Sequence, residues 1–310
     1  MRDTQVQTSW FDEVWPRVVV ASGVGYLAAT YGISRWLTRR SPARVVAPHW
    51  PRCAIEPLQC RASDGILLRG WCIEPEQPRA TIALFHGMRL NRMHTLERIE
   101  FLVAAGYRCV AFDHRAHGES DGRICSFGYH EGRDVEAVFD LIRARWPRQR
   151  SGAVGTSMGA AAVCFAAGAA IGFDALVLES VYTELAQAFN QRIGCGYPAW
   201  FQHFRGGVVW LTERRLGASI HQVAPLAFVA RLAPRPVLFV TGRDDPHAPP
   251  DDVAKLAQQV PASGRFHVIP GAGHADVCSQ GGAIYQRLLL DFFAEHFGFA
   301  HPDIRASRAA

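Results

Sequence analysis

The sequence predicts an α/β fold in which a doubly wound, mostly parallel sheet is covered by helices on both faces. The main observation is that β-type and helical patterns take turns along the chain, which is typical of a parallel sheet built from strand-helix-strand units. A chain of 310 residues with 49% apolar content can also bury a substantial core, as one large domain or two smaller ones. The third observation is a glycine-flanked serine placed between a short strand and a helix.

Short runs rich in β-branched and aromatic residues predict strands, and longer runs with a helical period predict helices. The strands are expected at 66–73, 80–85, 107–112, 175–178 and 236–241. The helices are expected at 92–105, 131–145, 158–170 and 281–297. Residues 181–233 break this rhythm and predict a largely helical cap inserted over the carboxyl edge of the sheet. It carries, among other aromatic residues, Tyr182, Phe189, Tyr197, Trp200, Phe201, Phe204 and Trp210.

An apolar run at 18–33, bounded by Arg17 and Arg35, predicts a membrane anchor. A spanning helix needs about 20 apolar residues, and flanking tryptophans and snorkelling arginines extend a slightly short run. The anchor is therefore assigned to residues 18–37 within an N-terminal segment 1–40, either spanning the membrane or lying in its interface. The alternative is an amphipathic helix that packs on the domain.

Arginines are more frequent after this run than before it. Arg2 and Arg17 precede it, and the arginines that follow it are Arg35, Arg39, Arg40, Arg44 and Arg52. By the positive-inside rule, we expect a single-pass protein of a bacterial inner membrane whose globular domain lies in the cytoplasm. A cleaved signal peptide fits less well, because Asp12 and Glu13 stand where a positive region belongs.

The remainder of the chain divides by composition. Four prolines in residues 41–57 predict a stiff linker without regular structure. The globular domain is expected at 58–300, including the cap at 181–233, and residues 301–310 form a tail.

Charge and cysteine content exclude several classes of partner. The net charge of +5 comes from basic residues scattered along the chain, so no nucleic-acid partner is indicated. The eight cysteines are dispersed without a C-x-x-C pair, so no zinc site is indicated. Their even number leaves disulfides open. The reaction that the motifs below predict implies no cofactor.

The strongest chemical signal is Gly155-Thr156-Ser157-Met158-Gly159, which fits a nucleophile elbow. In such an elbow a strand turns sharply into a helix and holds the serine in a strained conformation. The residues two positions before and after the serine must therefore be very small.

A serine hydroxyl needs a base to take its proton, and His274 is the best candidate among the histidines. It lies in a glycine loop after the β-like run at 266–269, where the last strand of a doubly wound sheet delivers a side chain to the carboxyl edge. Asp245, after the strand at 236–241, is the candidate that fixes the histidine tautomer. Asp244 and Glu179 are its rivals.

An oxyanion requires two converging backbone N–H donors. Met158, directly after the serine, supplies one. The loop His86-Gly87-Met88, after the strand at 80–85, supplies the other from Met88.

Taken together, these motifs resemble the α/β-hydrolase family over roughly residues 58–297. They are His-Gly at 86, DHRAHGES at 113–120, GTSMG at 155, GRDDPHAP at 242 and GAGH at 271. SDGILLRGWCIEP at 63–75 and LESVYTEL at 178–185 are similar to membrane-anchored esterases and monoacylglycerol or lysophospholipid lipases.

The resemblance implies that Ser157 is the nucleophile, His274 the base and Asp245 the acid, with Met88 and Met158 as the oxyanion hole. Ala116 replaces the usual glycine of the D-x-R-G-x-G-x-S stretch, and Met88 replaces the common asparagine after His-Gly. The second departure is expected to reshape the acyl pocket.

These residues predict a serine hydrolase that cleaves carboxylic esters, with an apolar or lipid-like acyl group, through an acyl-enzyme. A thioesterase, amidase or aminopeptidase with the same triad is the alternative among enzymes. A non-catalytic, membrane-associated binding protein is the alternative of another class. A metal site at His114, His117 and Glu119 is less favoured than a role for these side chains in bracing their loop.

Overall fold

The computed structural model of the chain describes residues 10–50, 53–167, 172–196, 199–274 and 276–299. Its centre is an eight-stranded sheet in the order β10-β9-β8-β7-β4-β5-β3-β2. The pairs from β10 to β5 are parallel, and β3 and β2 complete one side in antiparallel pairing. The predicted fold class is confirmed.

The sheet strands are β2 (Ala54–Arg61), β3 (Leu67–Glu74), β4 (Ala80–Phe85), β5 (Tyr107–Phe112), β7 (Ser151–Thr156), β8 (Ala175–Glu179), β9 (Val237–Gly242) and β10 (Gly264–Ile269). β4, β5, β8 and β9 have every residue buried, because helices cover both faces of the parallel part. A separate two-stranded pairing joins β1 (Ser41–Pro42) to β6 (His117–Gly118).

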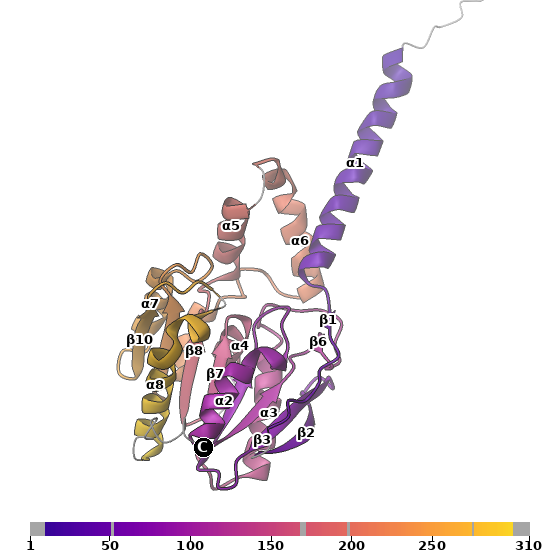
Figure 1. Cartoon of the computed structure of the whole chain (residues 1–310). Coiled ribbons are helices and arrows are strands. Elements are labelled where there is room, and N and C mark those ends of the chain that lie inside the picture. The colour runs from indigo at the N-terminus through magenta and orange to yellow at the C-terminus, as the bar shows by residue number, and fades with distance from the viewer. Residues whose placement is uncertain (1–9, 51–52, 168–171, 197–198, 275, 300–310) are drawn as a thin grey trace, which may run out of the picture.

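Helices α2 (Leu96–Ala104) and α8 (Val277–Phe297) cover one face of the sheet, and α3 (Gly132–Arg145) and α4 (Met158–Ala166) cover the other (Figure 1). The core is accordingly divided into two clusters. One contains Val138 and Val163, and the other contains Leu102 and Leu289. α7 (Pro250–Gln258) packs against β9 and β10.

The described part of residues 181–233 is largely helical. It contains α5 (Leu185–Gly196), α6 (Arg205–Leu216) and three 3-10 helices at Ala199–Phe204, Pro225–Ala227 and Val229–Leu232. α5 and α6 lie beyond one end of the sheet, the same end from which α1 projects away from the fold (Figure 1). Of the cap aromatics named above, Tyr197 lies outside the described residues.

The proline-rich segment contains more structure than predicted. Residues 54–57 belong to β2, and Pro57 pairs with Trp71 of β3. β2 is the edge strand of the sheet, where proline is tolerated because one side of the strand has no neighbour to receive an N–H. The globular domain therefore begins before residue 58.

The predicted anchor lies in α1 (Trp10–Leu37), which rises away from the sheet with its C-terminal end beside α6 (Figure 1). No helix in the described part of the chain is long and apolar enough to cross a membrane. The prediction of a spanning helix at 18–37 is thus wrong: glycines, serines and threonines interrupt its apolar residues. The predicted single-pass location and orientation depended on that span and lose their basis.

Candidate active site

Ser157 sits in a sharp turn between β7 and α4. Its backbone angles are φ 52° and ψ −109°, a region that residues with a side chain rarely adopt. A Cβ on Gly155 would lie 2.7 Å from the Ala160 backbone, and one on Gly159 would overlap the Phe85 carbonyl oxygen. The two glycines of the motif are therefore required by space, as the elbow geometry predicts.

The loops after β9 and β10 bring two further side chains to this turn. Ser157 Oγ lies 2.9 Å from His274 Nε2. His274 Nδ1 lies 2.9 Å from both carboxylate oxygens of Asp245. The structure thus assembles the three predicted residues, from three separate loops, into one hydrogen-bonded chain.

Asp245 is held as a carboxylate. Its side chain is fully buried, and its Oδ1 accepts hydrogen bonds from the backbone N–H groups of His247 and Ala248 at 2.8 and 2.9 Å. Burial alone would raise the pKa of Asp245, but the hydrogen bond and charge of His274, with the two N–H groups, outweigh it and lower that pKa. The negative charge needed beside Nδ1 is therefore maintained.

Glu179, one of the two rival carboxylates, has other partners. Arg98 Nε donates to its Oε1 at 3.0 Å, Tyr285 donates to the same oxygen, and Thr156 Oγ1 donates to its Oε2 at 3.0 Å. This buried cluster lies behind the elbow, and the Glu179 carbonyl accepts the Ser157 N–H at 2.8 Å. Glu179 therefore stabilises the turn through its hydrogen bonds to Thr156 and Ser157.

The other rival, Asp244, is exposed, and its backbone N–H donates to the Ala272 carbonyl at 2.9 Å. That bond joins the two loops that carry Asp245 and His274.

The loop after β4 lies directly against the serine. A Cβ on Gly87 would be 3.7 Å from Ser157 Cβ and 3.6 Å from the Thr156 carbonyl oxygen. In the described part of the chain, the N–H of Met88 donates to no backbone carbonyl of another element, and the same holds for Met158. Met158 directly follows Ser157 and Met88 follows Gly87, so both predicted donors belong to segments that border the serine, without a competing acceptor of that kind.

The residues weighed as metal ligands brace their loops instead. His114 Nδ1 lies 3.4 Å from Asp134 Oδ2, and Glu119 pairs with Arg92. Both ring nitrogens of His117 face backbone groups. The described residues contain no group of three or more His, Cys, Asp or Glu side chains that could hold a metal.

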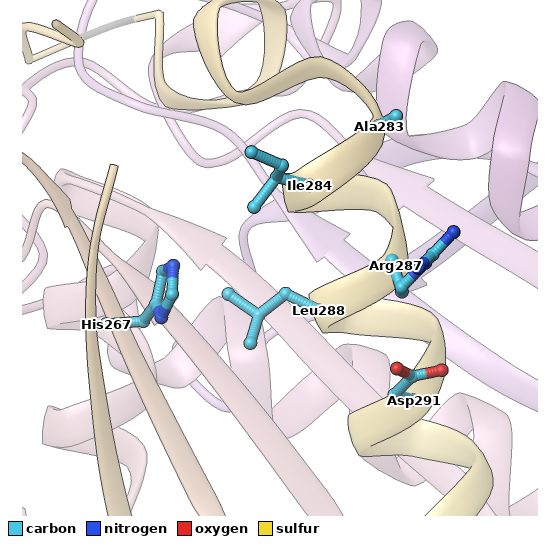
Figure 2. Close-up of a pocket in the computed structure, with 6 residues that line it drawn as sticks. All are labelled: His267, Ala283, Ile284, Arg287, Leu288 and Asp291. Atoms are coloured by element: carbon cyan, nitrogen blue, oxygen red, sulfur yellow. The ribbon is translucent and has the colours of Figure 1, made fainter. Parts of the chain in front are cut away.

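A surface hollow between β10 and α8 is separate from this site. Figure 2 shows its lining residues, which are His267, Ala283, Ile284, Arg287, Leu288 and Asp291. None of the three hydrogen-bonded residues lines it.

Two features of the site were not found from the sequence. The Arg98–Glu179 ion pair joins residues that are 81 positions apart, so no local pattern reveals it. The His247 ring lies edge-on to His274, with 5.1 Å between centroids. Its place two residues after Asp245 was the available signal.

Comparisons with known proteins agree with this architecture. Residues 76–216 match the family model described as serine aminopeptidase, S33. The chain is 24% identical to the uncharacterized protein YqkD of Bacillus subtilis over 241 residues, covering 74% of this chain and 75% of that protein. It is 26% identical to the uncharacterized protein YfhR of Escherichia coli K12 over 248 residues, covering 76% and 80%. The solved structure of the Pyrococcus furiosus esterase Pf2001 superposes with a TM-score of 0.69 at 22% identity, covering 84% of this chain and 99% of that one.

Proposed function

We propose that this chain is an α/β-hydrolase, and that it is a serine hydrolase that cleaves carboxylic esters through an acyl-enzyme on Ser157. The observation that carries the proposal is the continuous hydrogen-bonded chain from Ser157 Oγ through His274 to the buried Asp245. A hydroxyl, an imidazole and a carboxylate in this order form a nucleophile, its base and the group that orients the base.

The proposed reaction has two steps. Asp245 accepts the hydrogen on His274 Nδ1, which leaves Nε2 as an acceptor facing Ser157 Oγ. Oγ attacks the ester carbonyl carbon while its proton passes to Nε2, and that proton then leaves with the alcohol. Water attacks the resulting acyl-enzyme by the same proton path and releases the acid. The Met88 and Met158 N–H groups hold the negative oxygen of each tetrahedral intermediate.

Active-site labelling tests the proposal most directly. The full-length protein should react with a fluorophosphonate probe at one serine and hydrolyse p-nitrophenyl esters. Ser157→Ala should lose both reactions and keep its melting temperature, because the change removes one hydroxyl. A wild-type protein that takes no label would instead favour a non-catalytic binding protein, and an alanine variant with wild-type turnover would exclude Ser157.

The ester substrate is distinguished from an amide by a second assay. The family model is described as an aminopeptidase, and the same triad opens amides and thioesters. We expect kcat/KM for a p-nitrophenyl ester to exceed that for an aminoacyl p-nitroanilide of equal size. The reverse order would assign the chain to peptide hydrolysis, and a preference for an acyl thioester would make it a thioesterase.

We further propose an apolar acyl group. Met88 stands where the α/β-hydrolases that this sequence resembles commonly have an asparagine. It is partly buried against the core cluster that contains Val138 and Val163, as are Phe189 and Val209 of the cap. Some cap rings have a packing role, since Tyr182 donates to the Phe127 carbonyl at 2.6 Å. The test is a series of p-nitrophenyl esters from acetyl to decanoyl. Rising kcat/KM with chain length supports the proposal, and a flat series contradicts it.

A further inference from the structure

Arg89, the residue after the Met88 donor, has a left-handed backbone with φ 63°. This conformation is uncommon for a residue with a side chain and persists only where surrounding contacts hold it. Because Arg89 N closes the peptide unit that follows Met88, its conformation sets the path of the loop on which the Met88 N–H lies.

The backbone N–H of Arg89 is held by a buried histidine. It donates to His117 Nε2 at 3.1 Å, while His117 Nδ1 lies 2.8 Å from the Arg115 carbonyl oxygen. Nδ1 must therefore carry the hydrogen, and Nε2 is the acceptor. Burial lowers the pKa of His117, which keeps the ring neutral and able to accept.

The side chain of Arg89 is held by the end of the N-terminal helix. Its Nη2 donates to the Trp36 carbonyl at 3.2 Å, and its guanidinium lies 3.7 Å from the centroid of the Trp36 ring. Stacking of guanidinium on indole is a favourable cation–π arrangement. Arg89 therefore joins the loop beside Ser157 to α1.

The end of α1 is itself fixed to the fold. The Thr38 carbonyl accepts the Cys125 N–H at 3.0 Å, and Thr38 Oγ1 accepts from Arg215 Nε of α6 at 2.8 Å. Ser41 then pairs with His117 in the two-stranded β1-β6 ladder. The helix end and the histidine that hold Arg89 thus belong to one connected structure.

We propose that Arg89 is a positioning residue for the oxyanion hole, fixed by His117 at its backbone and by Trp36 at its side chain. The C-terminal end of α1 is then part of the scaffold of the active site. The inference rests on the proposed function, since it concerns the N–H donor of the same serine.

The test compares Arg89→Met with a matched control, Arg35→Met. Arg35 lies on α1, next to Trp36, and makes the same types of contact, donating to the Tyr31 hydroxyl at 3.3 Å with its guanidinium 5.8 Å from the centroid of that ring. In Arg89→Met, kcat for a p-nitrophenyl ester should fall by between about 10- and 100-fold with little change in KM, because a misplaced donor weakens transition-state binding. Arg35→Met should match the wild type.

The inhibition constant of a trifluoromethyl ketone distinguishes a misplaced oxyanion-hole donor from a general loss of structure. Ser157 adds to its carbonyl and the resulting oxyanion occupies the hole, so its Ki for Arg89→Met should rise by the same factor as kcat falls. His117→Gln retains an acceptor near the position of Nε2 and should keep more activity than His117→Leu.

The inference is overturned if Arg89→Met stays within about twofold of the wild type in kcat and Ki, or if Arg35→Met loses as much. Equal losses in the two His117 variants would remove the role given to Nε2. Melting temperatures show whether each variant is folded. A wild-type protein that neither hydrolyses esters nor binds the ketone would refute the proposed function, and the inference with it.

Discussion

Substitution of Asp245 and of Glu179 by their amides should have opposite effects. In Asp245→Asn, the carbonyl oxygen stays at the Oδ1 position, where two backbone N–H groups donate to it. The NH2 group then occupies the Oδ2 position, 2.9 Å from His274 Nδ1, and cannot accept a hydrogen there. The remaining oxygen also lies 2.9 Å from Nδ1, but it is uncharged and already accepts the two backbone N–H groups. The imidazole is driven toward the tautomer with hydrogen on Nε2, which cannot take a proton from Ser157.

The expected loss follows from that tautomer. Hydrogen on the wrong nitrogen costs about 10³ to 10⁴ in kcat, which is roughly 4 to 5.5 kcal/mol of transition-state stabilisation. The free energy of unfolding should change by less than about 2 kcal/mol, because the backbone hydrogen bonds to the side chain remain.

Glu179→Gln should lose stability instead. The substitution leaves the Arg98 guanidinium, whose side chain is 6% exposed, without its counter-charge. An uncompensated buried charge costs about 3 to 5 kcal/mol. At temperatures where this variant is folded, kcat should stay within about threefold of the wild type, because the Glu179 side chain makes no hydrogen bond to His274.

The assay measures kcat on one p-nitrophenyl ester and thermal unfolding for both variants, with the exposed Asp244→Asn as the control. Asp244→Asn should be unchanged in both. An inactive but folded Glu179→Gln beside an active Asp245→Asn would refute the reasoning and place the acid on β8.

Three further predictions concern the fold around the site and the metal dependence of the reaction. Gly159→Ala should abolish folding, because its Cβ would overlap the Phe85 carbonyl oxygen, whereas Gly206→Ala, which meets nothing within 4 Å, should fold normally; soluble yield and circular dichroism decide. Burial lowers the pKa of His86 and of His117, so below pH about 6.5 the unfolded chain takes up protons that the native state excludes. The free energy of unfolding should therefore decrease as the pH is lowered below this value, by up to about 1.4 kcal/mol per pH unit for each histidine. Chemical denaturation of His117→Gln at several pH values should give a shallower dependence of this free energy on pH. Addition of a chelator should leave ester hydrolysis unchanged, since the proposed reaction uses no metal; loss of activity would contradict it.

The three residues of the hydrogen-bonded chain were accessible from the sequence because each follows a strand. The carboxyl ends of parallel strands meet at one edge of a sheet, so Ser157, Asp245 and His274 had to lie close together once the strands were recognised. The glycines two positions before and after Ser157 also indicated a sterically tight turn, and this pattern can be recognised in the local sequence.

Contacts between distant segments were not accessible in this way. The Arg98–Glu179 pair depends on how α2 packs against β5 and α8, and a buried ion pair has no signature in local sequence. β2 was missed in part because Pro57 argues against a strand unless the strand is known to lie at an edge. Edge position is a property of the whole sheet order.

The N-terminal helix shows why hydropathy misled the prediction for residues 18–37. On the face of α1 that packs against α6, Thr30 and Ser34 are buried, and the buried Thr38 follows directly after the helix, so these three side chains are spaced four residues apart. Ser34 Oγ accepts from Thr212 Oγ1 of α6 at 3.2 Å, and a Cβ on Gly207 would meet Thr30 Cγ2 at 2.7 Å. Close approach of two helices favours such small side chains, which contribute little to an apolar average. Mean hydropathy therefore reflected the exposed apolar side chains of this helix, whereas small and polar side chains make its contacts with α6.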